Sequence, residues 1–298
     1  MNVVVDKYGV RLDKYLSETL DISRTKVQKL IDEDKVLVNG NKVSSSYKVS
    51  VDEKIDVDTD LNFDIDIEGE DIPLDIVYED KYLAIINKQS GMVVHPAAGN
   101  YEHTLVNALI YKYDMKTDNN LRPGIVHRLD KDTSGLMVVA LDDKTLELLS
   151  DMMKNKQVER KYLAIVDGVI PHDVGTIDAP IGRDPHNRQK MAVTDKNAKE
   201  AVTHFRVLER FLNHTLIECK LDTGRTHQIR VHMNYIGHPV SNDPLYGKKK
   251  GITSFGQMLH SHSIKFIHPI TKKELFFEVE PPKEFNEYLE EIKKDSSL

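Results

Sequence analysis

The sequence RPGIVHRLDKDTSG at residues 122–135, followed at once by the apolar run LMVVAL at residues 136–141, decides the fold. The apolar run has the length and composition of a buried strand. The block before it consists of charged residues and turn formers, so we expect a loop that a rigid strand holds in place. Catalytic and binding residues concentrate in loops of this kind.

Asp130 is the residue of this loop that could carry chemistry. Its neighbours His127, Arg128 and Lys131 are expected to keep its carboxylate ionised by their positive charge. An ionised and oriented carboxylate can act as a nucleophile or as a base. The alternative is a surface turn, in which Asp130 and Asp132 cap backbone N–H groups and pair with Arg128 and Lys131. These residues alone favour the surface turn, so the rest of the chain has to decide.

The composition is that of an ordinary globular protein, with 298 residues, 40% of them hydrophobic and 30% charged. The N-terminus lacks the pattern of a secretory signal, and no apolar run has the length of a membrane span. The single cysteine, Cys219, excludes an internal disulfide and argues against a thiolate metal cluster. We therefore expect a cytoplasmic protein that does not associate with membranes.

The formal net charge of −7 is unevenly distributed. Residues 49–86 contain thirteen acidic residues but only two basic ones, Lys54 and Lys81, so the rest of the chain is net positive. Such asymmetry is compatible with a nucleic-acid-binding surface outside the acidic stretch.

Residues 11–43 have the pattern of two amphipathic helices followed by a tight hairpin. The apolar residues that share a helical face are Leu12, Tyr15, Leu16 and Leu20 in residues 11–20, and Val27, Leu30 and Ile31 in residues 24–34. Ser23 is the expected N-cap of the second helix, and Asn39-Gly40 is a hairpin signal between residues 36–38 and 42–43. The whole pattern resembles the alpha-L RNA-binding module first seen in a small-subunit ribosomal protein.

In such modules the second helix contacts RNA phosphates. The resemblance therefore implies RNA binding by Arg24, Lys26 and Lys29, whereas the alternative is an ordinary solvated helix face. The acidic stretch that follows alternates apolar and acidic residues, so we expect part of it to be an edge strand and the rest a linker. The apolar residues of this alternation are Ile55, Val57, Phe63, Ile65 and Ile67.

The remainder of the chain has the pattern of many strands with few helices between them. Strands are expected at residues 76–78, 81–88, 136–141, 161–166, 201–208, 216–221 and 275–279, and helices at residues 104–111 and 144–156 and from residue 284. This order predicts an α+β fold with a mostly antiparallel sheet. We expect a first domain at residues 1–62, an acidic linker at 63–74 and a second domain at 75–298.

A second informative stretch is LDTGRTHQIRVHM at residues 221–233, where a strand ends at Gly224 and a polar helix begins. Arg225 and Arg230 would lie beside the helix N-terminus, a place suited to anions. A guanidinium group there could bind a carboxylate or a phosphate in a two-pronged geometry. The alternative is a structural pair of arginines that binds carbonyl groups at the strand end.

The thirteen histidines do not form a metal-binding motif. The closest pairs, His227 with His232 and His260 with His262, lack the spacing of a helical zinc pair, and there is no cysteine cluster. Phosphate-binding glycine loops and dinucleotide fingerprints are also absent from the sequence. We therefore expect neither a metal nor a cofactor.

Three motifs in one order are more specific than any of them alone: HRLDKDTSG at residues 127–135, RKYLA at 160–164 and TGRTHQIRVH at 223–232. GHP at 237–239 and DPLYG at 243–247 follow them. Over roughly residues 75–280 the chain resembles the RluA/RluD family of RNA pseudouridine synthases. With an alpha-L module in front, it resembles the RluD-type branch, which acts on large-subunit ribosomal RNA.

The resemblance implies the pseudouridine synthase fold and an isomerase that works without a metal or a cofactor. Such an enzyme flips a uridine out of the RNA, breaks the bond from N1 to the ribose, turns the base and rejoins it through C5. The resemblance implies that Asp130 is the essential carboxylate, that Arg230 pairs with it, and that Tyr162 lies against the base and can help to remove the C5 proton. Arg128 matches a residue that can fill the space left by the base.

Further RNA contacts are expected for His127 and Arg225. The expected partner is large-subunit ribosomal RNA, free or in a pre-ribosomal particle, and the expected state is a monomer.

Two other functions compete with this interpretation. A non-catalytic RNA-binding or ribosome-assembly protein could keep the fold, but the intact set of Asp130, Tyr162 and Arg230 argues against it. A hydrolase could use Asp130 with His127 or His232, but it would usually need a second catalytic carboxylate. The sequence does not indicate one.

Overall fold

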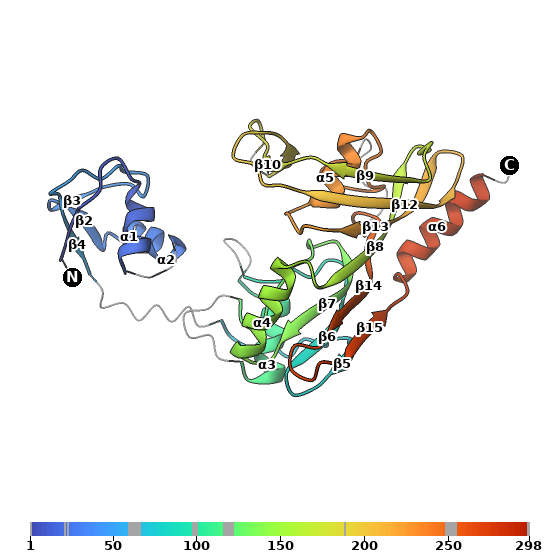
Figure 1. The fold of residues 1–298 in the computed structure, drawn as a ribbon, viewed down its shortest axis with the longest axis horizontal. Coiled ribbons are helices and arrows are strands. Elements are labelled where there is room, and N and C mark those ends of the chain that lie inside the picture. The colour runs from blue at the N-terminus through green and yellow to red at the C-terminus, as the bar shows by residue number, and fades with distance from the viewer. Residues whose placement is uncertain are drawn as a thin grey trace. The chain divides into compact units, whose positions relative to one another are not determined.

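The computed structural model describes residues 2–20, 22, 24–58, 67–96, 101–115, 122–187, 189–247 and 255–296, without the side chains of Thr25 and Lys26. The chain divides into two compact units, Met1–Asp64 and Ile65–Leu298 (Figure 1). No helix in these described ranges combines the length and the hydropathy of a membrane span.

The first unit packs two helices on a small antiparallel sheet. Its elements are β1 (Asn2–Val4), α1 (Leu12–Leu20), α2 (Arg24–Asp32), β2 (Val36–Val38), β3 (Asn41–Lys42) and β4 (Lys54–Val57), with strand order β1-β4-β2-β3. The predicted helical faces are confirmed, since one buried core contains Leu12, Tyr15, Leu16, Val27, Leu30 and Ile31, with Leu20 packed against it. The predicted hairpin joins β2 to β3.

The prediction of an edge strand in the acidic stretch is wrong for Ile55 and Val57. Both are buried in β4, which lies inside the sheet with β1 on one side and β2 on the other. The strand β1 covers this edge, and three residues near a terminus are too few to give a periodic signal. Ser23, Phe63 and Ile65 lie outside the described residues.

A buried carboxylate links the two helices of the first unit. The side chain of Asp13 is fully buried and accepts hydrogen bonds from Arg11 at 2.9 Å, Arg24 at 2.8 Å and Gln28 at 2.9 Å. The hydrogen bond from Arg11, with those from Arg24 and Gln28, outweighs the effect of burial and holds the pKa of Asp13 well below its usual range. Asp13 therefore stabilises the unit as an ion.

Asp13→Asn should lower the stability of the first unit by about 2 kcal/mol, because it removes the charged acceptor of two arginines. Since the pKa of Asp13 is lower in the folded than in the unfolded chain, its contribution should be present above about pH 5 and be lost as the pH falls below about 4. Amide hydrogen exchange of residues in α1 and α2 measures this. Asp56→Asn, on the exposed face of β4, is the control and should change little. Equal exchange in both variants would contradict the role of Asp13.

The second unit is built on a nine-stranded sheet in the order β5-β6-β7-β14-β8-β13-β12-β9, with β15 paired to β14 (Figure 1). The described strand pairs are antiparallel except β7 with β14, so the predicted α+β class and the mostly antiparallel sheet are confirmed. The strands are β5 (Ile76–Glu79), β6 (Leu83–Lys88), β7 (Ser134–Ala140), β8 (Glu159–Asp167), β9 (Val174–Asp178), β12 (Val202–Arg210), β13 (His214–Leu221), β14 (Leu259–Ile267) and β15 (Glu274–Glu278).

Within the described residues, four helices and a small hairpin complete the second unit. They are α3 (Leu105–Tyr113), α4 (Asp143–Lys154), α5 (Gln228–Tyr235) and α6 (Lys283–Asp295), and the hairpin of β10 (Ile181–Arg183) with β11 (Met191–Val193). Two of the helices have side-chain N-caps. Thr104 caps α3 and forms a capping box with Asn107, and Asp142 caps α4 by accepting a hydrogen bond from the Thr145 N–H. Helix α6 packs Phe285, Tyr288 and Ile292 into one cluster with Ile165 and Met258.

Strand β7 is the predicted buried strand, and all seven of its residues are buried. Successive side chains point to opposite faces of a sheet. Met137 and Val139 therefore enter one core cluster, and Leu136 and Val138 enter another on the other face. Burial on both faces explains why this run is continuously apolar rather than alternating.

Gly135, at the start of β7, allows β14 to approach closely. Its φ is +110°, and a Cβ atom there would lie 2.2 Å from the backbone oxygen of Ser261. Only glycine fits this position, because both the conformation and the space exclude a side chain. The parallel pairing of Ser134 and Gly135 with His260 and Ser261 therefore fixes where the loop before β7 ends.

Candidate active site

The loop before β7 is held by hydrogen bonds to its backbone. Lys88 is 1% exposed, and its ammonium group donates to three backbone carbonyl groups at 2.8–3.0 Å, one of them that of Lys131. Ser90 Oγ donates to the Asp132 carbonyl at 3.0 Å, and the Thr133 N–H donates to the Asp130 carbonyl at 3.1 Å. The position of Asp130 therefore depends on contacts with segments distant in the sequence.

Arg230 binds Asp130 and holds it in one orientation. It lies on α5, and its Nη1 donates to Oδ2 of Asp130 at 2.8 Å. The Arg230 side chain is 6% exposed and that of Asp130 is 15% exposed. The other edge of the guanidinium group binds Asp243 in a two-pronged geometry, with Nε to Oδ2 at 2.7 Å and Nη2 to Oδ1 at 2.9 Å. Two carboxylates thus share one guanidinium group.

Mutual stabilisation of these charges outweighs their burial. Burial alone would lower the pKa of Arg230, but the hydrogen bonds and charges of Asp243 and Asp130 raise it above its usual value. Burial would likewise raise the pKa of Asp243, yet Arg230 holds it below its usual range. Arg230 and Asp243 are therefore a buried ion pair whose remaining donor is directed at Asp130.

Asp243 is a site residue to which sequence reasoning assigned no role. Its Oδ1 also accepts the backbone N–H groups of Leu245 at 2.8 Å and Tyr246 at 3.0 Å, so its orientation is fixed. The motif DPLYG contains it, but nothing in the sequence pairs this carboxylate with an arginine thirteen residues earlier. The only available signal was an aspartate followed by a turn.

His227 is the second residue beside Asp130 that sequence reasoning did not select. Its Nε2 lies 3.9 Å from Oδ1 of Asp130, and its Nδ1 is hydrogen-bonded to the hydroxyl of Tyr246 at 2.9 Å. The hydroxyl of Tyr246 in turn accepts a hydrogen bond from the Met191 N–H at 2.8 Å. The guanidinium group of Arg230 lies over the Tyr246 ring, with 5.1 Å between Cζ and the ring centroid. Burial lowers the pKa of His227, so its ring is neutral at neutral pH.

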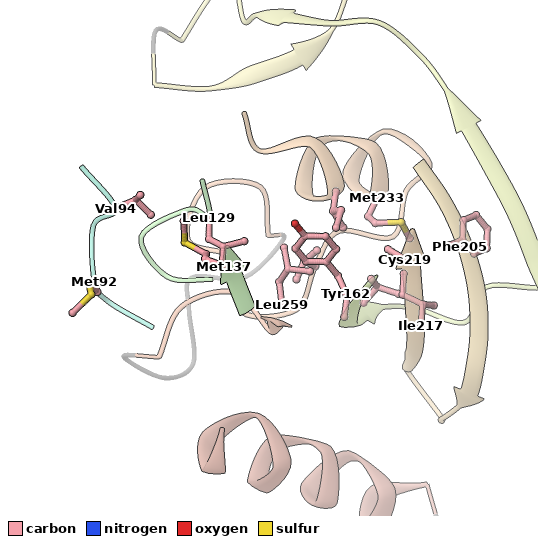
Figure 2. Close-up of a cluster of buried hydrophobic side chains, with 14 of the residues drawn as sticks. Met92, Val94, Leu129, Met137, Tyr162, Phe205, Ile217, Cys219, Met233 and Leu259 are labelled. Carbon is pink, nitrogen blue, oxygen red and sulfur yellow. The ribbon is translucent and has the colours of Figure 1, made fainter. Parts of the chain in front are cut away.

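Tyr162 lies on β8 in the apolar wall of the site. It is 4% exposed and belongs to the core cluster that contains Leu129, Ile229 and Leu259. Figure 2 shows its ring among the apolar side chains of this cluster. Burial raises the pKa of its hydroxyl, which is therefore protonated at neutral pH.

A cleft of about 390 Å³ is lined by residues of this site, among them His227. The predicted site residues that line it are Asp130, Tyr162, Arg230, His127, Arg128 and Arg225. Arg128 is exposed, whereas Arg225 is partly buried and donates from Nε to the Glu200 carbonyl at 2.8 Å.

The other predicted RNA-binding residues belong to the first unit. Arg24 is half-exposed but is tied to Asp13, and Lys29 is half-exposed and 3.7 Å from Glu33. The side chain of Lys26 lies outside the described residues.

The expectation that His127 adds positive charge beside Asp130 is wrong. Its Nε2 accepts the backbone N–H of Val138 at 3.1 Å, which ties the ring to β7. Burial, together with the positive charge of Arg160, lowers the pKa of His127 to about 3. The ring is therefore neutral, and Arg230 supplies the charge that holds Asp130.

The fold and the site define an RNA-modifying enzyme of the pseudouridine synthase class. The family model described as RNA pseudouridylate synthase matches residues 82–235, and that of the S4 domain matches residues 10–55. The chain belongs to the RNA pseudouridine synthase family, as the sequence motifs predicted.

Relatives match along nearly the whole chain. The chain is 49% identical to the Uncharacterized RNA pseudouridine synthase YlyB of Bacillus subtilis over 288 residues, which cover 96% of this chain and 95% of the relative. It is 40% identical to the Ribosomal large subunit pseudouridine synthase D of Escherichia coli, over 97% of this chain and 93% of that protein. Among solved structures, Human RNA Pseudouridylate Synthase Domain Containing 1 matches with a TM-score of 0.59 and 28% identity, over 72% of this chain and 86% of that one.

Asp243→Asn should slow the isomerisation by about 10- to 100-fold, because it removes a charged partner that orients Arg230 and through it Asp130. Single-turnover kinetics with saturating enzyme measures this, and RNA affinity should change little. Asp222→Asn removes a carboxylate that pairs with the half-exposed His204, and it should leave the rate unchanged. A wild-type rate for Asp243→Asn in a folded protein would rule out the orienting role.

Proposed function

We propose that the substrate of this pseudouridine synthase is large-subunit ribosomal RNA. The relatives named Ribosomal large subunit pseudouridine synthase D support this, because they match both units of the chain rather than the catalytic unit alone. The proposal includes a monomer that acts in the cytoplasm, on the RNA itself or on a pre-ribosomal particle that contains it.

The observation that carries the proposed mechanism is the carboxylate of Asp130, held by a buried arginine at the wall of a cleft of about 390 Å³. Asp130 is proposed to be the essential catalytic carboxylate, with Oδ2 bound by Arg230 and Oδ1 left to face the substrate. The bond from N1 to the ribose breaks, the base turns, and a bond from C5 to the ribose forms. The proton lost from C5 is balanced by the one gained at N1, so the product is an isomer.

Tyr162 is proposed to lie against the flipped base. Its ring is part of the apolar wall and offers a flat surface for the uracil. Its hydroxyl oxygen would help to remove the proton from C5 after the base has turned. Because burial raises the pKa of this hydroxyl, the tyrosine enters the reaction in its neutral form, so it would give its own hydroxyl proton to N1 of the released base as its oxygen takes the proton from C5.

The RNA-binding residues are proposed from their charge and their positions. Arg128 is exposed at the cleft and would fill the space that the flipped base leaves, while His127 and Arg225 would contact the inserted nucleotide. Extraction of the base costs a few kcal/mol, which contacts of this kind have to offset. In the first unit, Arg24, Lys26 and Lys29 are proposed to contact phosphate groups.

The hydrolase alternative is weakened by the surroundings of Asp243. A glycosidic hydrolase would usually need a second carboxylate that can exchange a proton with the substrate or with water. The Asp243 side chain is fully buried, its oxygens are bound by Arg230 and two backbone N–H groups, and it does not line the cleft. It is therefore a positioning residue for Arg230.

Cells that lack this chain should lose specific pseudouridines from large-subunit ribosomal RNA, and the wild-type gene should restore them. Asp130→Asn should not restore them, because the amide cannot replace the carboxylate, and its rate of tritium release from C5-labelled RNA should fall by at least about 1,000-fold. RNA affinity should persist.

Asp132→Asn is the matched control, because it removes a carboxylate from the same loop and should restore the modifications. If large-subunit RNA kept every pseudouridine in the absence of the chain, the proposed substrate would be wrong. If Asp130→Asn released tritium at the wild-type rate, the proposed role of Asp130 would be wrong instead.

A further inference from the structure

Arg160 occupies an unusual place in the wall of the cleft. It lies near the start of β8, where buried and partly buried residues alternate, and it points to the same side of the sheet as Tyr162 and Ala164. Tyr162 and Ala164 belong to the apolar core, whereas Arg160 continues their row with a charged group. Arg160 is only 8% exposed, and it lines the same cleft as Asp130.

The side chain of Arg160 makes no hydrogen bond or ion pair with any residue that the structure describes, and its Nε is buried without a partner. The other buried cations of this region differ from it. Arg230 binds two carboxylates, and Lys88 donates to three carbonyl groups. An unpaired charge that is nine-tenths buried is costly. A partner from outside the chain would remove this cost.

Two further unpartnered groups lie in the same cleft. Four buried side-chain polar atoms have no partner in the described part of the chain, and three of them belong to residues that line the cleft: Nε of Arg160, Nδ1 of His127 and Nδ1 of His95. Because Nε2 of His127 accepts the Val138 N–H, the neutral ring must carry its hydrogen on Nδ1. His127 therefore offers a second unused donor, close enough to Arg160 for that charge to affect its pKa.

The charges of the cleft favour an anion. The cationic residues among the described residues that line it are Arg122, Arg128, Lys154, Arg160, Arg225 and Arg230, against one acidic residue, Asp130. Asp130 is already paired with Arg230. The guanidinium group of Arg160 lies against Gly224, where a Cβ atom would be 3.4 Å from Nη1, and the adjacent Arg225 extends the positive surface.

We propose that Arg160 binds a phosphodiester group of the nucleotide that enters the active site, with the Nδ1–H of His127 as a second donor. The phosphate is the group of RNA that carries full negative charge, and a guanidinium binds it in a two-pronged geometry. The inference rests on the proposed function only in that RNA is the substrate. The proposal places a phosphate contact at a buried arginine, whereas the sequence predicts phosphate contacts at Arg24, Lys26 and Lys29 of the first unit.

Arg160→Met tests the proposal in the full-length Asp130→Asn protein, which binds RNA without turnover. Loss of one phosphate contact should weaken RNA binding and reduce the slope of log affinity against log salt by about 0.7 to 0.9. Lys161→Met is the matched control, because it removes a positive charge from the next residue of β8 and should leave the slope unchanged. An unchanged slope for Arg160→Met would overturn the proposal.

The melting temperature separates binding from a structural role. Since Arg160 has no partner in the described chain, Arg160→Met should not lower the melting temperature of the free protein. A lower melting temperature with unchanged RNA binding would assign Arg160 to the fold and overturn the proposal.

Single methylphosphonate linkages on either side of the target uridine identify the contact, because each removes the charge of one phosphate. At one linkage, the methylphosphonate should lower the RNA affinity of the protein with Arg160 about tenfold. The same methylphosphonate should hardly change the RNA affinity of the Arg160→Met protein, which already lacks this contact. Equal losses in both proteins at every linkage would contradict the proposal even if large-subunit RNA is modified. If the otherwise wild-type enzyme neither binds nor modifies this RNA, the proposed function fails as well.

Discussion

The active site depends on one guanidinium group placed between two carboxylates. Arg230 binds Asp243 in a two-pronged geometry and uses its remaining edge for Asp130. Asp243 is in turn oriented by the backbone N–H groups of Leu245 and Tyr246. The orientation of Asp130, the proposed catalytic carboxylate, thus depends on a turn more than a hundred residues away in the sequence.

The rest of the fold brings the ends of this chain of contacts together. Strand β7 and the close approach of β14 at Gly135 fix the end of the loop that carries Asp130. Helix α5, which follows β13, carries Arg230. Strand β8 lies between β14 and β13 in the sheet and contributes Tyr162 and Arg160. One sheet, with the loop before β7 and the helix after β13, therefore brings together Asp130, its partner Arg230, the proposed wall for the base and the proposed phosphate contact.

Local patterns predicted many of the described elements, because periodicity reports how a segment is buried, but strands β9 and β14 were not predicted. The strand at residues 136–141 and the apolar faces of α1 and α2 were read directly from apolar spacing. The position of β4 inside its sheet was not, since it depends on β1, a strand too short to give a signal. The pairing of Asp130 with Arg230 came from resemblance to a family and not from spacing.

The sequence does not show which side chains become partners when the tertiary fold brings distant segments together. Asp243 looked like a turn residue, and Asp13 like a polar position on an amphipathic helix. His127 looked cationic until the N–H of Val138 and its burial were known. Arg160 was part of a motif, but its lack of a partner among the described residues is a property of the folded cleft.

The most direct test of this account is a double-mutant cycle of Arg230→Lys and Asp243→Asn on the single-turnover rate. If both residues act only through the orientation of Asp130, each change should remove most of the same effect, and the double variant should be little slower than the slower single variant. Strictly additive losses would show that Arg230 and Asp243 act independently, and would contradict the orientation of Asp130 by Asp243 through Arg230.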